Sequence, residues 1–254
     1  MRVQGAFDFE GPIEVIAHRG YSARAPENTR IAMEMAIDAG ADALEFDVHT
    51  IADGTPVLFH DTTLKRTGGG SGPIRDQSIE NLGRLDAGSW FGPAFAGEPV
   101  PTLASVLEGV RGRVGRVYAE IKGYRSLEDV DRIAGLVDQA GMRASTVFIS
   151  MDWAALDRIR AGWADALLGY IVDEAQRIDE GIARAAVDPK ALLDFDARLL
   201  LADPTRVARA RAASIELAAW TVNRVRDAAR LVEMGVPRIT TNEVETLVAW
   251  KTTL

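Results

Sequence analysis

Short apolar segments alternate along the chain with longer segments in which apolar residues recur at intervals of three and four. The short segments have the length and composition of buried strands, and the longer ones have the period of amphipathic helices. We predict strands at residues 15–18, 43–48, 116–121, 146–150, 166–171, 196–201, 215–221 and 238–241. We predict helices at residues 29–39, 102–110, 127–139, 153–160, 204–212, 225–234 and 244–250.

Strands that alternate with helices form a parallel sheet covered by those helices. Eight such repeats in a chain of 254 residues favour a closed (β/α)8 TIM barrel of the α/β class over an open doubly wound sheet. A chain of this length can bury one large core, so we expect a single domain over residues 1–254.

The apolar segment at residues 56–60 departs from this alternation. It follows the strand at 43–48 after too few residues for a parallel crossover, which needs about a dozen or more. We predict an antiparallel hairpin that turns at residues 52–54, where Asp53-Gly54 is a favoured turn pair, and that sets His60 roughly opposite Asp47. The glycine- and proline-rich segment that follows completes a small insertion, at about residues 49–100, over the barrel mouth.

Charged and imidazole side chains stand where the predicted strands end. These groups are His18-Arg19, Glu45 with Asp47, His60-Asp61, and Glu120 with Lys122. Residues two apart in a strand share a face, so the members of each strand pair point the same way. Barrel active sites lie at the carboxyl ends of strands, so we expect these groups to converge. Burying their charges is costly unless a metal, an ion partner or a bound anion uses them.

Composition narrows the class of partner. A net charge of -8 and a pI near 5.0 argue against nucleic acid and anionic membranes, which reward Lys and Arg. The absence of cysteine excludes disulfides, thiolate metal ligands and a cysteine nucleophile. Residues 1–20 lack a basic start followed by an apolar run, and no uncharged apolar stretch reaches membrane-spanning length. We therefore expect a cytoplasmic protein without membrane insertion.

Three carboxylates and two basic side chains suggest chemistry at phosphorus. Glu45, Asp47 and Glu120 would form an oxygen site suited to one divalent cation, Mg2+ or Ca2+. Arg19 and Lys122 can neutralise phosphate oxygens, Arg as a planar fork and Lys as a point charge. This combination is typical of a phosphodiesterase.

Two imidazoles, His18 and His60, complete that set, because they can accept and donate protons near neutral pH. Each group also has a structural interpretation. A lone His18 is typical of a core histidine, and the two charged strand pairs are typical of polar strand ends or an internal ion pair. His49 lacks such company, so we expect a surface or hairpin residue.

Ordered motifs add a resemblance to a known family. They are HRG at His18 to Gly20, PENT at Pro26 to Thr29, EFDV at Glu45 to Val48, HD at His60-Asp61, EIK at Glu120 to Lys122 and WTVN at Trp220 to Asn223. Together they strongly resemble the glycerophosphodiester phosphodiesterases over about residues 16–242. The resemblance implies a barrel of the phosphatidylinositol phospholipase type. It also implies divalent-metal hydrolysis of small glycerophosphodiesters, such as glycerophosphocholine or glycerophosphoethanolamine, to sn-glycerol 3-phosphate and an alcohol.

The family pattern also implies roles for individual residues. It makes Glu45, Asp47 and Glu120 the metal ligands, His18 and His60 the acid/base pair, Arg19 and Lys122 the phosphate-binding groups, Glu27 and Asn28 part of the site near the metal, and Trp220 the wall for the glycerol. By analogy, one histidine assists attack by a glycerol hydroxyl and the other protonates the leaving alcohol. Two positions depart from the pattern, namely Asn242 in place of an acid and Met151 in place of an aromatic residue.

Other functions compatible with these residues stay open at the level of sequence. A lysophospholipase D would use similar groups on lysolipids, and a Schiff-base lyase would use Lys122 as its nucleophile. A third alternative is a barrel that binds a phosphodiester without turning it over. The leaving alcohol, the physiological metal, the assignment of acid and base, and the oligomeric state do not follow from the sequence.

Overall fold

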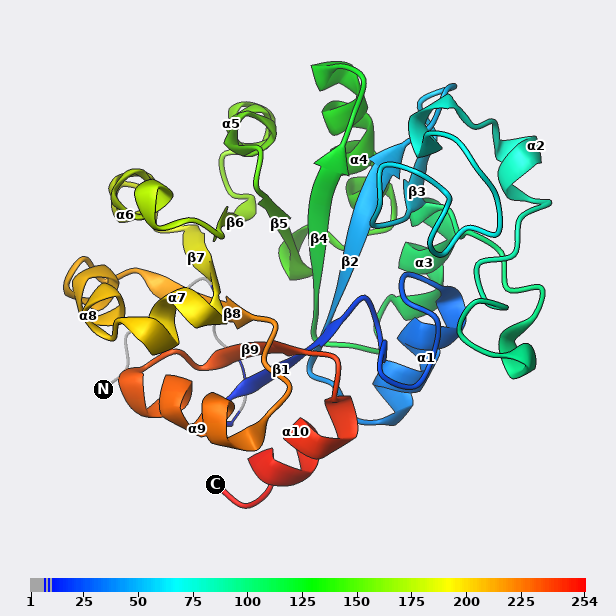
Figure 1. Ribbon diagram of the computed structural model, residues 1–254. Coiled ribbons are helices and arrows are strands. Elements are labelled where there is room, and N and C mark those ends of the chain that lie inside the picture. The colour runs from blue at the N-terminus through cyan, green and yellow to red at the C-terminus, as the bar shows by residue number, and fades with distance from the viewer. Residues whose placement is uncertain (1–6, 8, 10) are drawn as a thin grey trace.

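Eight parallel strands close into a barrel in the computed structural model, which describes residues 7, 9 and 11–254 (Figure 1). The strands are β1 (Glu14–His18), β2 (Ala43–Thr50), β4 (Arg116–Gly123), β5 (Thr146–Ser150), β6 (Leu167–Val172), β7 (Ala191–Asp196), β8 (Glu216–Trp220) and β9 (Arg238–Thr241). They follow one another around the barrel in this order, and β9 pairs with β1 to close it. The predicted TIM barrel is confirmed.

Helices surround this barrel and supply the outer layer of the core (Figure 1). They are α1 (Arg30–Asp38), α3 (Leu103–Val110), α4 (Leu127–Gln139), α5 (Trp153–Gly162), α6 (Ile178–Ala186), α7 (Ala197–Ala202), α8 (Thr205–Ala212), α9 (Val225–Met234) and α10 (Val244–Lys251). Helices α6 and α7 are additions to those predicted from periodicity. In the described part of the chain, no helix combines the length and apolar character needed to cross a membrane.

The inside of the barrel is filled by alternate side chains of the strands. The buried residues of this inner cluster include Ile16, Ala43, Tyr118, Ile149, Ile171, Leu192 and Ala218. Because alternate residues share a face, the inward positions nearer the strand ends are found by counting on in steps of two. Counting from Ile16 leads to His18, and counting from Ala43 leads to Glu45 and Asp47. The same alternation that packs the core therefore directs polar side chains into the barrel mouth.

The predicted hairpin is present, with β3 (Pro56–Leu58) antiparallel to β2. Its turn includes Gly54 at φ +82°, and the amide of Gly54 donates to the carbonyl of Ile51 at 2.8 Å. The register differs by one residue from the prediction, because the amide of Phe59 bonds the carbonyl of Asp47 at 3.0 Å. His60 therefore lies one residue beyond the position opposite Asp47.

The segment after this hairpin forms a small layer with its own apolar cluster (Figure 1). It contains η1 (Ile74–Asp76), α2 (Ile79–Leu82) and η2 (Pro93–Phe95). The cluster joins Leu64, Ile74 and Leu82 of this segment to Val57 and Phe59 of the hairpin. The region of weak periodicity in the sequence is thus held together by scattered apolar residues, which carry no helical or strand period.

One predicted strand is wrong. The structure places β7 at Ala191–Asp196, and residues 197–201, predicted as the rest of a strand, lie in α7. The sequence from 191 to 202 is apolar almost throughout, so periodicity alone does not mark the boundary. Asp196 marks it chemically, because its carboxylate accepts the amide of Arg198 at 2.8 Å and caps the helix.

Candidate active site

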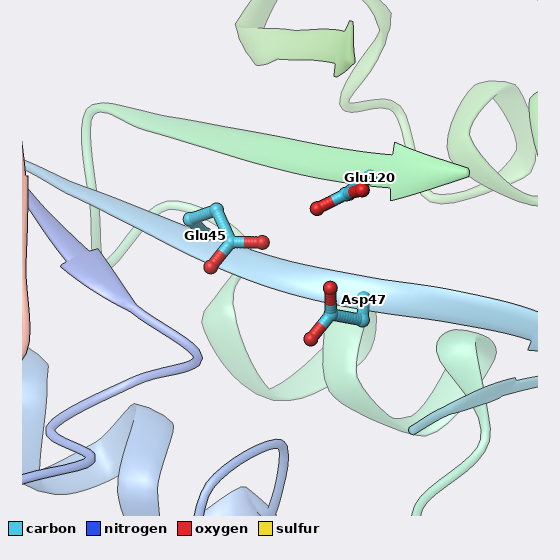
Figure 2. Close-up of side chains that lie close together, drawn as sticks. All are labelled: Glu45, Asp47 and Glu120. Carbon is cyan, nitrogen blue, oxygen red and sulfur yellow. The ribbon is translucent and has the colours of Figure 1, made fainter. Parts of the chain in front are cut away.

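Three carboxylates meet on two neighbouring strands of the barrel (Figure 2). Glu45 and Asp47 come from β2 and Glu120 from β4, and one oxygen of each lies within 4.8 Å of the others. Glu45 is 3% exposed and Asp47 is fully buried. The structure thus brings together the three acids that the sequence singled out.

The ionisation of these acids reflects burial and mutual repulsion. Burial and the neighbouring carboxylates raise the pKa of Glu45 well above its usual value and that of Glu120 to about 8. Burial opposes ionisation of Asp47 too, but Arg19 and Lys122 outweigh it and lower its pKa. The protein therefore supplies less positive charge than three ionised carboxylates require.

The donor atoms of this cluster fit a divalent cation. Glu45 Oε1 and Asp47 Oδ1 are buried and receive no hydrogen bond from any described residue. Buried carboxylate oxygens without a partner are costly, and a cation would satisfy them. A site with oxygen donors alone suits Mg2+ or Ca2+. Glu45, Asp47 and Glu120 are the residues that would hold it.

The loop between β1 and α1 holds Asp47 in place. Asn28 donates from Nδ2 to Asp47 Oδ2 at 2.7 Å and accepts the amide of Asp47 at 3.0 Å. Asn28 and Arg19 both have positive φ, +58° and +56° respectively, which asparagine tolerates better than arginine does. Gly20 also has positive φ, and a Cβ there would lie 2.6 Å from the backbone of Ala32. These constraints are a structural reason for the HRG and PENT motifs of this loop.

The two basic side chains lie against the carboxylates. Arg19 Nε is 3.1 Å from Asp47 Oδ2, and Arg19 Nη1 donates to Glu27 Oε1 at 2.8 Å. Lys122 Nζ is 3.2 Å from Glu120 Oε1. Burial works to lower the pKa of Lys122, but Glu120 and Asp47 outweigh it and the pKa is raised. A lysine kept charged in this way is suited to binding an anion rather than to attacking a carbonyl.

His18 points from the end of β1 toward the carboxylates. Its Nδ1 lies 2.7 Å from Asn242 Oδ1, an oxygen that also accepts the hydroxyl of Ser22 at 2.8 Å. Because this amide oxygen can only accept, Nδ1 of His18 carries a proton and Nε2 is free, 4.0 Å from Glu45 Oε2. Burial and the charge of Arg19 lower the pKa of His18 to about 4. The neutral ring thus presents an unprotonated nitrogen to the site.

His60 enters the same site from the insertion. Its Nδ1 lies 2.7 Å from Asp61 Oδ1, and its Nε2 lies 3.4 Å from Lys122 Nζ. Arg66 donates to Asp61 Oδ1 at 2.7 Å and to Glu27 Oε2 at 2.7 Å. Arg66, which the sequence did not single out, therefore ties the His60 segment to the loop after β1.

His49 lies in the hairpin, one of the two places predicted for it, and it is buried in β2. Its Nε2 donates to the backbone carbonyl of His60 at 3.1 Å. His49 thus supports the segment that carries His60 and does not reach the carboxylates.

One side of a pocket is lined by the charged and imidazole side chains, and its other side is largely apolar. The charged and imidazole side is formed by His18, Arg19, Glu45, His60, Glu120 and Lys122. The other side is formed by Ile149, Met151, Ile171, Asp194, Trp220 and Thr240. Trp220 ends β8, and its Nε1 donates to the backbone carbonyl of Asp194 at 3.3 Å. Asp194 is a pocket residue that the sequence analysis missed, because the strand was placed five residues too late. Its signal was an acid within the apolar run Leu192–Phe195.

Comparison with known proteins identifies the family of this chain. The model of the glycerophosphoryl diester phosphodiesterase family matches residues 18–246. The chain belongs to this family. It is 36% identical over 234 residues to YhdW of Bacillus subtilis, provisionally named a glycerophosphodiester phosphodiesterase, with 90% of this chain and 93% of that one covered. It is 31% identical over 238 residues to the glycerophosphodiester phosphodiesterase of Caldanaerobacter subterraneus, with 92% and 96% covered.

A solved structure extends the likeness to the whole barrel. The Oleispira antarctica phosphodiesterase, solved in complex with the product sn-glycerol-3-phosphate, has a TM-score of 0.84 and 27% sequence identity to this chain. The match covers 95% of this chain and 97% of that one. The protein is thus an enzyme of the glycerophosphodiester phosphodiesterase type.

In this glycerophosphodiester phosphodiesterase, Asn242 is expected to orient His18. Replacing Asn242 with leucine removes the acceptor of His18 Nδ1 and should lower kcat roughly 10-fold or more, with a smaller change in KM. The matched control is Ser22→Ala, which removes a second donor to the same oxygen without touching His18 and should cost far less. Steady-state kinetics decides, and equal effects of both variants would contradict this role.

Proposed function

We propose that this enzyme hydrolyses glycerophosphodiesters, such as glycerophosphocholine and glycerophosphoethanolamine, to sn-glycerol 3-phosphate and an alcohol. One observation carries the proposal: a buried group of three carboxylates, in which Glu45 Oε1 and Asp47 Oδ1 receive no hydrogen bond from any described residue, adjoins the pocket that His18 and His60 line. We propose further that Glu45, Asp47 and Glu120 hold one Mg2+ or Ca2+. When bound there, the cation supplies positive charge that polarises a phosphoryl oxygen.

The basic groups of the pocket are suited to the phosphate. Lys122, charged and 17% exposed, can contact a phosphate oxygen with Nζ. Arg19 is held between Glu27 and Asp47 and adds a fixed positive charge to the same side of the pocket. Asn28 keeps Asp47 in position. In this proposal the phosphate lies on the β2 and β4 side of the barrel mouth.

Each of two steps needs two proton transfers. In the first step the attacking glycerol hydroxyl loses a proton as its oxygen bonds to phosphorus, and the leaving alkoxide gains one as its bond to phosphorus breaks, which gives a cyclic phosphate. In the second step water loses a proton as it bonds to phosphorus, and the ring oxygen gains one as its bond to phosphorus breaks, which gives sn-glycerol 3-phosphate. His18 and His60 both hold Nδ1 in hydrogen bonds and turn Nε2 toward charged groups of the site. One Nε2 takes the first proton and the other ring provides the second, which is general acid and base catalysis.

Two other activities have different support. A Schiff-base lyase needs an uncharged lysine, whereas the neighbouring carboxylates favour the charged form of Lys122. A lysophospholipase D is favoured by one observation, the apolar side of the pocket with Ile149, Met151 and Ile171, on which an acyl chain can rest. This second candidate differs from the main proposal in its substrate and not in its catalytic groups.

Product release from a matched set of diesters tests the proposal. The purified enzyme is given glycerophosphocholine, glycerophosphoethanolamine or lysophosphatidylcholine with Mg2+, Ca2+ or a chelator, and sn-glycerol 3-phosphate and alcohol are quantified. We expect sn-glycerol 3-phosphate from the two deacylated diesters and only with a cation. Cleavage of the lysolipid in preference to both would support the second candidate. No cleavage of any diester with either cation would refute both.

A further inference from the structure

A buried carboxylate faces the pocket from the wall opposite the metal-binding group. Asp194 is 3% exposed and lines the pocket together with Ile171 and Trp220. Its Oδ1 is buried and receives no hydrogen bond from any residue that the structure describes. None of the catalytic roles above uses this side chain.

The topology of the barrel places Asp194 far from the three carboxylates. Strand β7 lies four strands from β2 in either direction around the barrel. Leu192 belongs to the inner cluster, so alternation turns Asp194 inward as well. In the register, Asp194 is the partner of Ile171 on β6 and of Ala218 on β8, both apolar members of that cluster.

An acid in these surroundings costs stability. Burial raises the pKa of Asp194 to about 7, so ionising it near neutral pH is unfavourable without a partner. A buried acceptor without a donor lowers the stability of the fold. A ligand that donates a hydrogen bond to it would explain why the acceptor is there. Asp196, two residues further on the same face, shows the alternative, because Arg198 and the start of α7 satisfy its carboxylate.

We propose that Asp194 accepts a hydrogen bond from the free hydroxyl of the glycerol moiety that is farthest from phosphorus, and so selects deacylated diesters over lysolipids. This inference rests on the proposed function. A phosphate at the carboxylates of β2 directs the rest of a small substrate across the barrel toward β7. Glu45 and Asp194 line the same pocket, so one small substrate can reach both sides of it.

The depth of Asp194 favours the glycerol over the leaving alcohol as its partner. Asp194 lies two residues before the end of β7, below Asp196. The slender glycerol moiety fits at this depth, whereas alcohols of different size need the open mouth. Acylation of the distal hydroxyl would remove the donor and leave the carboxylate buried beside an ester. Sites built to bind a hydroxyl reject analogues that lack it much more strongly than apolar pockets reject a size difference.

A pair of substrates isolates this contact. Glycerophosphoethanolamine is compared with the 2-hydroxypropyl diester of ethanolamine phosphate, which lacks only the distal hydroxyl. For Asp194→Leu we expect kcat/KM on glycerophosphoethanolamine to fall roughly 10- to 100-fold, as for the loss of a charged hydrogen bond. On the 2-hydroxypropyl diester we expect less than about a threefold change, since no hydrogen bond is lost. Equal losses on both substrates would overturn the inference.

Two control measurements separate this role from folding and from the leaving group. Asp196→Asn, on the same strand and face, should leave the ratio of kcat/KM values for the two substrates unchanged, because the Asp196 carboxylate caps α7. Replacing ethanolamine by the uncharged leaving alcohol methanol should leave the effect of Asp194→Leu in place. If the effect vanishes with methanol, Asp194 binds the ammonium group and the inference is wrong.

Product binding tests the contact without turnover. Calorimetry with Mg2+ present compares sn-glycerol 3-phosphate with 2-hydroxypropyl phosphate on the wild type and on Asp194→Asn and Asp194→Leu. We expect the wild type to bind sn-glycerol 3-phosphate with a Kd roughly 10-fold or more below that of 2-hydroxypropyl phosphate, and Asp194→Leu to lose this preference. Asp194→Asn retains an acceptor and should keep part of the preference. A wild type without the preference overturns the inference, whereas a wild type that binds with the preference but cleaves no diester overturns only the proposed function.

Discussion

Replacing His18 or His60 with alanine should lower kcat about 10^3-fold, within the range that general acid and base catalysis contributes. Each variant removes one of the two imidazole Nε2 atoms that face charged groups of the site, at 4.0 Å from Glu45 Oε2 for His18 and 3.4 Å from Lys122 Nζ for His60. Release of sn-glycerol 3-phosphate under saturating substrate measures the effect. KM should change less than kcat, because neither ring is assigned to hold the phosphate.

The double variant provides a sharper result. Two groups that serve the same transition state act as a unit, so His18→Ala combined with His60→Ala should cost much less than the product of the single effects. Thermal unfolding and calorimetric binding of sn-glycerol 3-phosphate verify that each variant is folded and retains its pocket. A single variant that keeps more than about a tenth of wild-type kcat would remove that histidine from the proposed chemistry.

Removing the divalent cation should abolish activity, and restoring Mg2+ or Ca2+ should recover it. Glu120→Gln and Asp47→Asn each remove one charged ligand from a group whose oxygens lie within 4.8 Å of one another. We expect each to lower kcat/KM by roughly 10^3-fold at a fixed cation concentration, because the loss combines weaker cation binding with a weaker electrostatic effect on phosphorus.

The matched control for these acids is Glu128→Gln. Glu128 is exposed in the first turn of α4, away from the pocket residues, and its loss should leave activity and metal response unchanged. Thermal unfolding adds a readout that does not depend on catalysis, because a ligand that binds only the folded state stabilises it. Mg2+ should raise the Tm of the wild type and of Glu128→Gln more than that of Glu120→Gln. Wild-type activity that persists at full strength in excess chelator would refute the metal site.

Much of the site follows from local sequence pattern. In strands that cross a barrel, inward positions recur every second residue, so Glu45 and Asp47 had to share a face, as did Glu120 and Lys122. Since active sites of this fold lie at the carboxyl ends of strands, their convergence was predictable. The hairpin that brings His60 to the site also followed from the short distance along the chain between β2 and β3. The turn allowed its register to be placed only to within one residue.

The errors arose where apolar composition hid a change of structure. From residue 191 to 202 the chain passes from β7 into α7 without a break in hydrophobicity, and only Asp196 marks the boundary. Because the predicted strand began at residue 196, Asp194 fell outside it and was not counted among the inward residues. The burial of His49 within the predicted hairpin did not follow from the sequence, because it depends on the carbonyl of His60 and on the packing of β4 beside it.

The sequence by itself determined the barrel, the three acids at the ends of neighbouring strands and the two histidines, because each depends on strand period or on a short connection. Only the tertiary structure decided which distant residues complete the site. Closing the barrel brings β9 beside β1, so that Asn242 bonds His18 although 224 residues separate them. It also sets Asp194 across the pocket from Glu45, since strand order and register arise from packing of the whole barrel and not from any one segment.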